Sequence, residues 1–221
     1  MDLYTHGNSP HYLLSRSGIF PPPNGFDCFN DWLHFTTRTG RPRACIHPSP
    51  FTRPYVLHSY PELEELQAKL EMYYKMFKLR ELLLWLSEYD EIFLNTRPAW
   101  DFYTRSALIA SERCLIPFDC DAFSRQVLYT LLQQVCEISL DHNQQLEVDG
   151  IVANQFQPRA RLPRQLLEEM LSEDLPVLEK KLSSSIKICE SHQHCKSLVF
   201  MDPQHKITLE FRNLYHELQS N

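Results

Sequence analysis

Polar side chains stand at the ends of three apolar stretches that the sequence predicts as strands, and they could take part in chemistry. They are Asn95, Asp119, Asp121 and Asn154. The carboxyl ends of parallel strands form the edge at which α/β proteins bind ligands. A strand that serves nucleotide hydrolysis would be expected to end in an acid, which holds the magnesium shell. Asn95 carries an amide there, so this residue bears directly on the chemistry the chain can perform.

Each of these residues also has a purely structural interpretation. Asn95 and Thr96 are residue types that commonly cap a turn after a strand, and the same holds for Asn154. Asp119 and Asp121 suggest an acid/base pair, but alternate residues on an extended segment point to opposite faces. Asp121 is well placed to cap the helix that the sequence predicts next.

The 221 residues contain no phosphate-binding P-loop. That motif needs glycines at fixed spacing followed by Lys and Ser or Thr, because only glycine lets successive backbone amides close around phosphates. The five glycines stand at positions 7, 18, 25, 40 and 150, and none is followed by Lys. Without such amides and a lysine, the charge that develops in phosphoryl transfer has no preorganised partner. We therefore do not expect ATP hydrolysis by this chain.

Two further groups of side chains could bind a ligand. Four residues of metal-binding type lie within seven positions, at Cys189, His192, His194 and Cys195. Zinc sites usually draw two pairs of ligands from separate elements, so we interpret this tight spacing as chance in a polar loop and predict no metal site. A surface for DNA phosphates, or simply a solvated face, could be formed by Arg159, Arg161, Arg164, Lys180, Lys181 and Lys187.

Apolar runs and helical periods predict that strands and helices alternate after residue 54. The predicted strands are Tyr55–Leu57, Glu91–Asn95, Arg113–Pro117, Val148–Asn154 and Pro176–Glu179. The predicted helices are Pro61–Ser87 with a break near Tyr73, Phe102–Ala110, Ala122–Leu140, Pro163–Ser172 and Ile207–Leu218. Continuous apolar strands suit a sheet that is buried on both faces. We therefore expect an α/β fold with a mostly parallel sheet flanked by helices.

Composition sets broad limits. The chain has 43% hydrophobic residues, enough for one α/β domain with a substantial core, and its net charge of -6 provides no global field that would attract DNA. Seven scattered Cys without CxxC spacing indicate a reducing cytoplasm, and no apolar run approaches the ~20 residues of a membrane span. Early prolines and glycines predict an irregular Pro-rich segment at 1–54, followed by the α/β domain at 55–221.

Several segments resemble the ParA and MinD-like partition ATPases, which carry a deviant Walker A motif. These segments are Tyr89–Pro98, Ala107–Ala110 with Leu115–Pro117, Val148–Phe156, and Asp202–Pro203. Asp2 to Ser9 also resembles the family's pattern Asp-x-Asp-Pro-Gln-Gly-Asn, which follows the P-loop helix, with Tyr4 in place of the second acid. In this alignment Asn95 stands where the family has the acid of its second Walker motif.

The resemblance implies a P-loop NTPase-like fold that lacks the first strand and the P-loop, in an N-terminally truncated or degenerate member. It implies ATP and Mg as cofactors of the family and Asn154 as a residue near the adenine. Non-specific DNA contacts are implied for Arg159, Arg161, Arg164 and Lys187. The implied location is the bacterial cytoplasm, in association with the nucleoid.

The expected function is plasmid or chromosome partitioning with ATP hydrolysis impaired or absent, because Tyr4 and Asn95 replace acids of the family. The expected partners are a second copy of the chain, a partition partner protein and DNA. The alternative is a nucleotide-independent protein that dimerises or binds a partner or DNA, or an inactive fragment. A parallel sheet without its first strand would expose apolar edge and face, so we also expect poor solubility or dependence on a partner.

Overall fold

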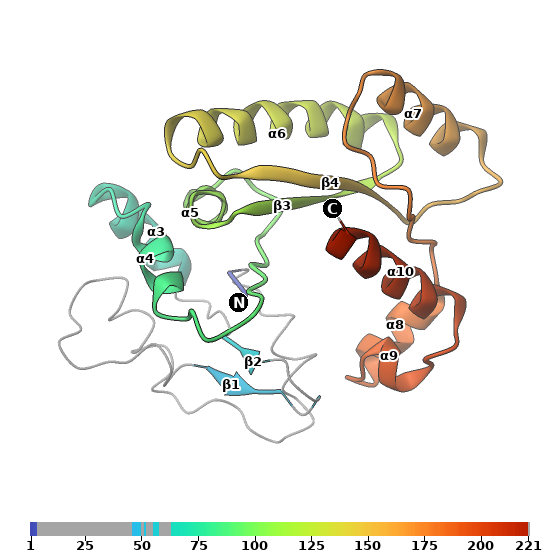
Figure 1. Cartoon of the computed structure of the whole chain (residues 1–221), viewed down its shortest axis with the longest axis horizontal. Helices are drawn as coiled ribbons and strands as arrows, with labels where there is room; N and C mark the ends of the chain where they lie inside the picture. Colours follow the sequence, from blue (N-terminus) through green and yellow to red (C-terminus); the bar gives the residue numbers. More distant parts are fainter. Residues whose placement is uncertain (4–45, 50, 52–54, 58–62, 221) are drawn as a thin grey trace. The chain divides into compact units, whose positions relative to one another are not determined.

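The computed structural model of the chain describes residues 1–3, 46–49, 51, 55–57 and 63–220 (Figure 1). Contacts within the chain divide it into two compact units, Met1–Ser111 and Glu112–Asn221, which are described separately below. Tyr4 and the predicted boundary at residue 54 lie outside the described residues, so both remain predictions.

The described residues of the first unit form a short antiparallel pair and three helices. Its elements are β1 His47–Pro48, β2 Tyr55–Val56, α3 Leu63–Met72, α4 Lys78–Leu84 and α5 Phe102–Ala110. The predicted break near Tyr73 is confirmed, because α3 ends at Met72 and Tyr74 has a φ of 53°. Leucines at helical spacing form the core with α5, as at Leu70, Leu79, Leu82 and Phe102.

Extended backbone in this unit brings three distant segments together. The amide of Asp2 donates to the carbonyl of Leu57 at 2.8 Å, and the amide of Leu3 donates to the carbonyl of Asn95 at 2.8 Å. The predicted strand Glu91–Asn95 is reduced to one parallel bridge between Asp2 and Asn95. Met1–Leu3 therefore lies between residue 57 and residue 95 and fixes the position of the Asn95 side chain.

The second unit is built on two parallel strands, β3 Arg113–Asp119 and β4 Glu147–Asn154. Its helices are α6 Ala122–Asp141, α7 Arg161–Ser172, α8 Ile186–Gln193, α9 Leu198–Met201 and α10 Lys206–Ser220. Figure 1 shows α6 and α7 on one side of the strands and α10 on the other. Side chains alternate along β4, so Ile151 packs with the first pair of helices and Val152 packs toward α10. The predicted α/β fold with a helix-flanked parallel sheet is confirmed for this unit.

A third extended segment runs beside β4. The amide of Ile151 donates to the carbonyl of Pro176 at 2.8 Å, and the amide of Leu178 donates back to Ile151 at 3.0 Å. The predicted strand Pro176–Glu179 is therefore present as one parallel bridge at Val177. Gly150 makes the close approach feasible, because a Cβ at this position would lie 2.5 Å from Leu178 side-chain atoms.

One element of the second unit differs from the sequence prediction. The stretch around Cys189, predicted as a polar loop, forms helix α8, which Ser185 caps by accepting from the amide of Lys187. Among the described residues, no helix is both long and apolar enough to cross a bilayer.

Candidate functional site

The carboxyl edge of β3 and β4 brings two predicted site residues into contact. The parallel register pairs Asp119 with Asn154. Asn154 Nδ2 donates to Asp119 Oδ1 at 3.0 Å, and Gln155 Nε2 reaches Asp119 Oδ2 at 3.5 Å. Gln155 has a φ of 48°, in the left-handed region that non-glycine residues seldom adopt. Asp119 thus receives amide groups from two consecutive residues at the end of the neighbouring strand.

Helix α6 begins directly after this edge. Asp121 caps it by accepting from the amides of Phe123 at 2.9 Å and Ser124 at 3.0 Å, which confirms the predicted capping role. The hydrogen bond from the Ser124 side chain, followed by those from the backbone, lowers the pKa of Asp121. Asp121 therefore serves the helix, whereas Asp119 faces Asn154.

A thiol and an ammonium group complete the edge. Burial, followed by the charge of Asp119, raises the pKa of Cys120 to about 11, so its thiol is protonated at neutral pH and is a poor nucleophile. Lys181 Nζ lies 5.3 Å from the centre of the Phe156 ring. The edge offers amides, a carboxylate and one ammonium group, which suit hydrogen bonding to a polar ligand better than covalent catalysis.

The strand tip of the first unit has a different arrangement. Asn95 Nδ2 donates to Asp2 Oδ1 at 2.9 Å, and Asp2 is only 3% exposed. The cap of helix α5 is supplied by Asp101, which accepts from the amide of Thr104 at 2.9 Å. The Asn95 amide is thus bonded to a buried carboxylate on a neighbouring segment.

The predicted DNA-contacting residues separate into two groups. Arg159, Arg161 and Arg164 are all exposed on the segment that leads into α7 and on its first turn. Lys187 lies on α8 and pairs with Glu190 at 2.8 Å. The hydrogen bond from Lys187 to Glu190 raises the pKa of Lys187. The structure therefore places the three arginines on one segment and leaves Lys187 on another helix.

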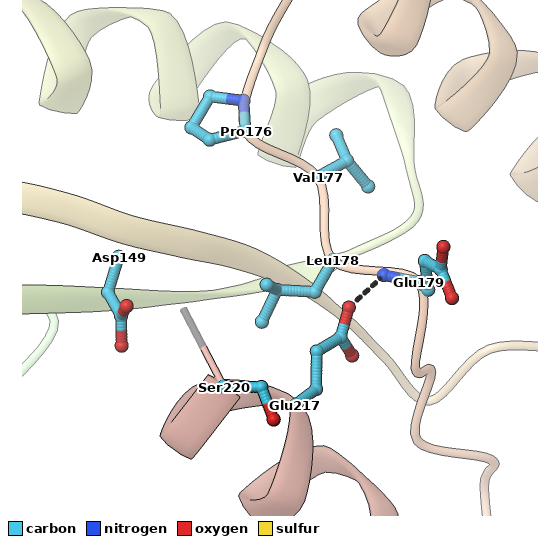
Figure 2. A pocket seen from close by; sticks show the side chains of 7 residues that line it. All are labelled: Asp149, Pro176, Val177, Leu178, Glu179, Glu217 and Ser220. Atoms are coloured by element: carbon cyan, nitrogen blue, oxygen red, sulfur yellow. Dashed lines mark hydrogen bonds between the residues drawn. The ribbon is translucent and has the colours of Figure 1, made fainter.

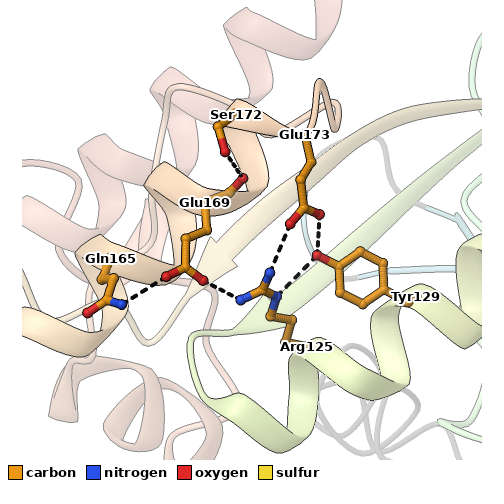
Figure 3. Close-up of polar contacts among 6 residues, drawn as sticks. All are labelled: Arg125, Tyr129, Gln165, Glu169, Ser172 and Glu173. Carbon is orange, nitrogen blue, oxygen red and sulfur yellow. Dashed lines mark hydrogen bonds and ion pairs between the residues drawn. The ribbon is translucent and has the colours of Figure 1, made fainter.

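An ionic network joins α6 to α7 (Figure 3). The Arg125 guanidinium pairs with Glu169 and, at 2.9 Å, with Glu173. Tyr129 also donates to Glu173, and Gln165 donates to Glu169 at 2.8 Å. Each charged group has a partner within the network, so we interpret it as a connection between helices rather than a binding site.

A cavity of about 460 Å³ lies beside Asp149, near the start of β4 (Figure 2). Its lining residues are Asp149, Pro176, Val177, Leu178, Glu179, Glu217 and Ser220. The Glu217 carboxylate accepts from the amides of Glu179 at 2.7 Å and Lys180 at 2.9 Å, and Asp149 pairs with Arg113. The described part of the chain holds no group of three His, Cys, Asp or Glu residues that could bind a metal.

Sequence reasoning missed the role of Asp119 at the edge. It treated Asp119 only as the possible partner of Asp121, although the two residues point to different groups. A usable signal was present, because Asp119 follows the predicted strand Arg113–Pro117 and Asn154 ends the predicted strand Val148–Asn154 in a mostly parallel sheet. The roles of Gln155 and Lys181 depend on turn geometry, which the sequence pattern does not specify.

A family model and several solved structures are similar to this chain. A family model described as "AAA domain" matches residues 30–148, just over half of the chain. The chain aligns with apo McdA from Cyanothece with a TM-score of 0.82 at 15% identity, covering 98% of this chain and 85% of McdA. A putative plasmid partition protein from Borrelia burgdorferi bound to AMPPNP aligns with a TM-score of 0.77 at 16% identity, covering 99% of this chain and 84% of that one. The fold is that of a P-loop NTPase-like α/β protein.

The curated relatives agree. The chromosome partitioning protein ParA of Myxococcus xanthus is 26% identical over 176 residues, which is 78% of this chain and 62% of the relative. This chain belongs to the ParA/MinD-like family of P-loop partition ATPases. It spans about six-tenths or less of the length of the first curated relatives it matches.

Proposed function

We propose that this chain is a partition-type protein that acts without hydrolysing ATP. The observation that carries the proposal is the 2.9 Å hydrogen bond from Asn95 Nδ2 to Asp2 Oδ1. Asn95 stands where the family resemblance expects the acid of the second Walker motif. An amide nitrogen is a donor and has no lone pair for a cation. The part of Asn95 that meets Asp2 is therefore unsuited to ligate magnesium.

Two further features of the chain argue against binding and hydrolysis of ATP with magnesium. The 221 residues contain no glycine-rich loop followed by Lys, and phosphoryl transfer depends largely on such positioning and electrostatics. Asn154 has the amide that the resemblance assigns to adenine contact, but this amide donates to Asp119. A nucleotide base would have to compete with that bond.

Phosphate release from ATP and Mg tests the loss of hydrolysis. The purified chain is expected to release no more phosphate than buffer, whereas the chromosome-partitioning ATPase Soj of Treponema pallidum serves as the active control. If a preparation of the chain hydrolyses ATP with magnesium but loses this activity on further purification, the activity belongs to a contaminating ATPase. Turnover that persists and follows the chain through successive columns would contradict the proposal.

Nucleotide-independent action is the second part of the proposal, and the bond between Asn154 and Asp119 supports it. Isothermal titration with ATP and Mg at millimolar concentration is expected to give no heat of binding. If heat is observed, the variant Asn154→Ala shows whether ATP binds at the carboxyl edge of β4, because ATP bound there would lose affinity in that variant. Such a loss would favour an ATP-dependent switch over nucleotide-independent action.

DNA contact is a second candidate activity, supported by the three exposed arginines. In the described part of the chain, no ion pair involves Arg159, Arg161 or Arg164. Exposed guanidinium groups on one segment can neutralise several phosphates and release counterions. Lys187 is held by Glu190, so we expect it to contribute less. Of the four residues for which the family resemblance implies DNA contacts, we therefore propose Arg159, Arg161 and Arg164 as the main ones.

Fluorescence anisotropy with a short DNA duplex of random sequence tests this activity. Replacing the three arginines by Ala should weaken binding and reduce the dependence of log affinity on log salt by about 2–3, at ~0.9 per phosphate contact. Lys187→Ala is the matched comparison, with a smaller expected effect. Wild-type binding that does not respond to salt, or an absence of binding at low salt, would exclude the DNA activity.

A further inference from the structure

The corner between α3 and α4 holds a tyrosine in a backbone conformation that favours glycine. The amide of Lys75 donates to the carbonyl of Leu70 at 3.0 Å, and the amide of Tyr74 donates to the carbonyl of Glu71 at 3.0 Å. These two hydrogen bonds form a Schellman motif, which ends a helix and places one residue in the left-handed region. Tyr74 occupies that position with a φ of 53°. Glycine adopts such a φ without steric cost, so the backbone gives no reason for a tyrosine here.

Packing gives no reason for this tyrosine either, because Tyr74 is 88% exposed. Two other helices end in the same motif, with Asp174 and Cys195 at the left-handed position. Asp is among the residue types that adopt this conformation more readily, and Cys195 Sγ lies 3.6 Å from the carbonyl of His192. The ring of Tyr74 lies in solvent, so nothing offsets its backbone strain within the fold. Strain of this kind is typical of functional positions.

Further apolar side chains are exposed beside Tyr74. Met72 and Tyr73 are 62% and 57% exposed, and Phe77 is 44% exposed. Leu79, at the start of α4, is buried in the core of the first unit, which holds the corner in place from within. Tyrosine, phenylalanine and methionine are enriched where proteins bind one another. We call Met72, Tyr73, Tyr74 and Phe77 the corner surface.

The charges beside the corner surface favour an acidic partner. The nearby acids Glu71 and Glu81 already have basic partners in the first unit. Lys69 and Arg80 are exposed, and in the described part of the chain no ion pair involves either of them. Lys69 precedes the corner surface by one helical turn and Arg80 follows it by one turn. A partner with carboxylates on both sides of an apolar centre would therefore complement this surface.

We propose that the corner surface binds a short segment of another protein in which acidic residues flank apolar side chains. The ring of Tyr74 packs against the apolar side chains of the segment, and Lys69 and Arg80 pair with its carboxylates. Tyrosine suits this task because it offers a large contact area with few rotatable bonds. Binding removes the ring from water, which offsets the strain at its backbone. The site goes beyond the proposed function, because it involves neither nucleotide nor DNA.

Replacing Tyr74 by glycine separates binding from stability. Tyr74→Gly should raise the midpoint of urea unfolding, because glycine relieves the left-handed strain and the lost ring is exposed. Asp174→Gly is the matched control, since Asp174 has the same backbone position at the end of α7. A lower midpoint for Tyr74→Gly would overturn the proposal, because it would show that the ring supports the fold.

A phage-displayed library of random peptides serves as the probe for binding. The full-length chain is the bait, and phage that also bind the Tyr74→Gly variant are removed. The remaining peptides are expected to be rich in Asp and Glu around Leu, Phe or Trp. In fluorescence anisotropy, a synthetic copy of the most enriched peptide should bind Tyr74→Gly at least about tenfold more weakly than wild type, as for a central aromatic contact. Asp174→Gly should bind the peptide as wild type does.

A charge exchange tests the role of the flanking cations. Arg80→Glu should weaken binding of the same peptide several-fold, and a peptide with Lys in place of its acids should bind this variant better than it binds wild type. Failure to recover any peptide that depends on Tyr74, or recovery of peptides without an excess of acids, would overturn the proposal. So would binding to phosphatidylserine vesicles that Tyr74→Gly abolishes, in the absence of peptide binding, because the corner surface would then bind lipid.

Discussion

Asn95 Nδ2 donates a hydrogen bond to Asp2 Oδ1 over 2.9 Å, across the parallel bridge that pairs these two residues. The amide and the carboxylate are complementary, because one donates and the other accepts. An acid at position 95 would bring a second carboxylate to the same distance from a residue that is 3% exposed. The amide is therefore matched to its neighbour, and an acid would repel it.

Restoring an acid at this tip should destabilise the fold. Asn95→Asp is expected to lower the free energy of unfolding at pH 7 by about 1–2 kcal/mol, a range that allows for solvent screening at the exposed residue 95. Repulsion raises the folded-state pKa of the introduced carboxyl group, so the loss is present above its unfolded-state pKa and vanishes at lower pH. Urea unfolding at pH 7 and at about pH 3 measures this. Thr96→Asp is the control, and an equal loss at both pH values would contradict the explanation.

Gly150 should tolerate no side chain. Gly150→Ala places a Cβ 2.5 Å from Leu178 atoms, so we expect a loss of about 1–3 kcal/mol from overpacking. Leu178→Ala alone should also destabilise, since it leaves a cavity. In the double variant the two losses should be less than additive, because the smaller residue 178 makes room for the added methyl group. Strict additivity in chemical unfolding would show that the two positions do not meet.

Cys120 should be nearly unreactive at neutral pH. Its pKa is raised to about 11 by burial and then by Asp119, so alkylation by iodoacetamide should speed up roughly tenfold per pH unit between pH 7 and 10. Asp119→Asn removes a negative charge and should lower the pKa of Cys120, which increases the rate at pH 8. Mass spectrometry of the labelled Cys120 peptide reports the rate. Asp90→Asn is the control, because it removes one negative charge outside this edge. An equal increase of the Cys120 alkylation rate in both variants would exclude a local effect of Asp119.

The network between α6 and α7 should give an acid-side dependence of stability. Hydrogen bonds from Gln165 and then Arg125 lower the pKa of Glu169. Its contribution is therefore present above the unfolded-state pKa of Glu169 and is lost as the pH falls through the folded-state value. Arg125→Gln should lower the melting temperature at pH 7 more than at about pH 3. Equal shifts at both pH values would indicate that Arg125 acts only by packing.

The sequence predicted correctly those features that neighbouring residues determine, such as a helix cap and a helix break. The cap at Asp121 follows from its residue type and place, and the break near Tyr73 from the interrupted leucine period. Helix α8 was missed because its apolar residues are few and its His and Cys residues suggested a loop. The continuous apolar run at 91–94 predicted a full strand, but only Asn95 forms a bridge with the described residues.

The contacts of the candidate site depended on pairing between distant segments. Asn95 and Asp2 are far apart in sequence, and nothing in either segment specifies that their side chains meet. The contact of Asn154 with Asp119 follows from the register of β3 and β4, which includes an irregularity between Cys114 and Leu115. One inserted residue in a strand changes which side chains stand opposite each other, so edge pairs could not be assigned from residue types alone.

Single-turnover hydrolysis tests the central claim most directly. The chain is placed in molar excess over radiolabelled ATP with Mg, with and without DNA, so that even one slow cleavage per protein is detected. We predict that the fraction of labelled phosphate released equals that of buffer in wild type and in Asn95→Ala alike. Release by wild type above buffer that Asn95→Ala or Asp2→Ala abolishes would contradict the account, because it would show that this pair of residues supports catalysis.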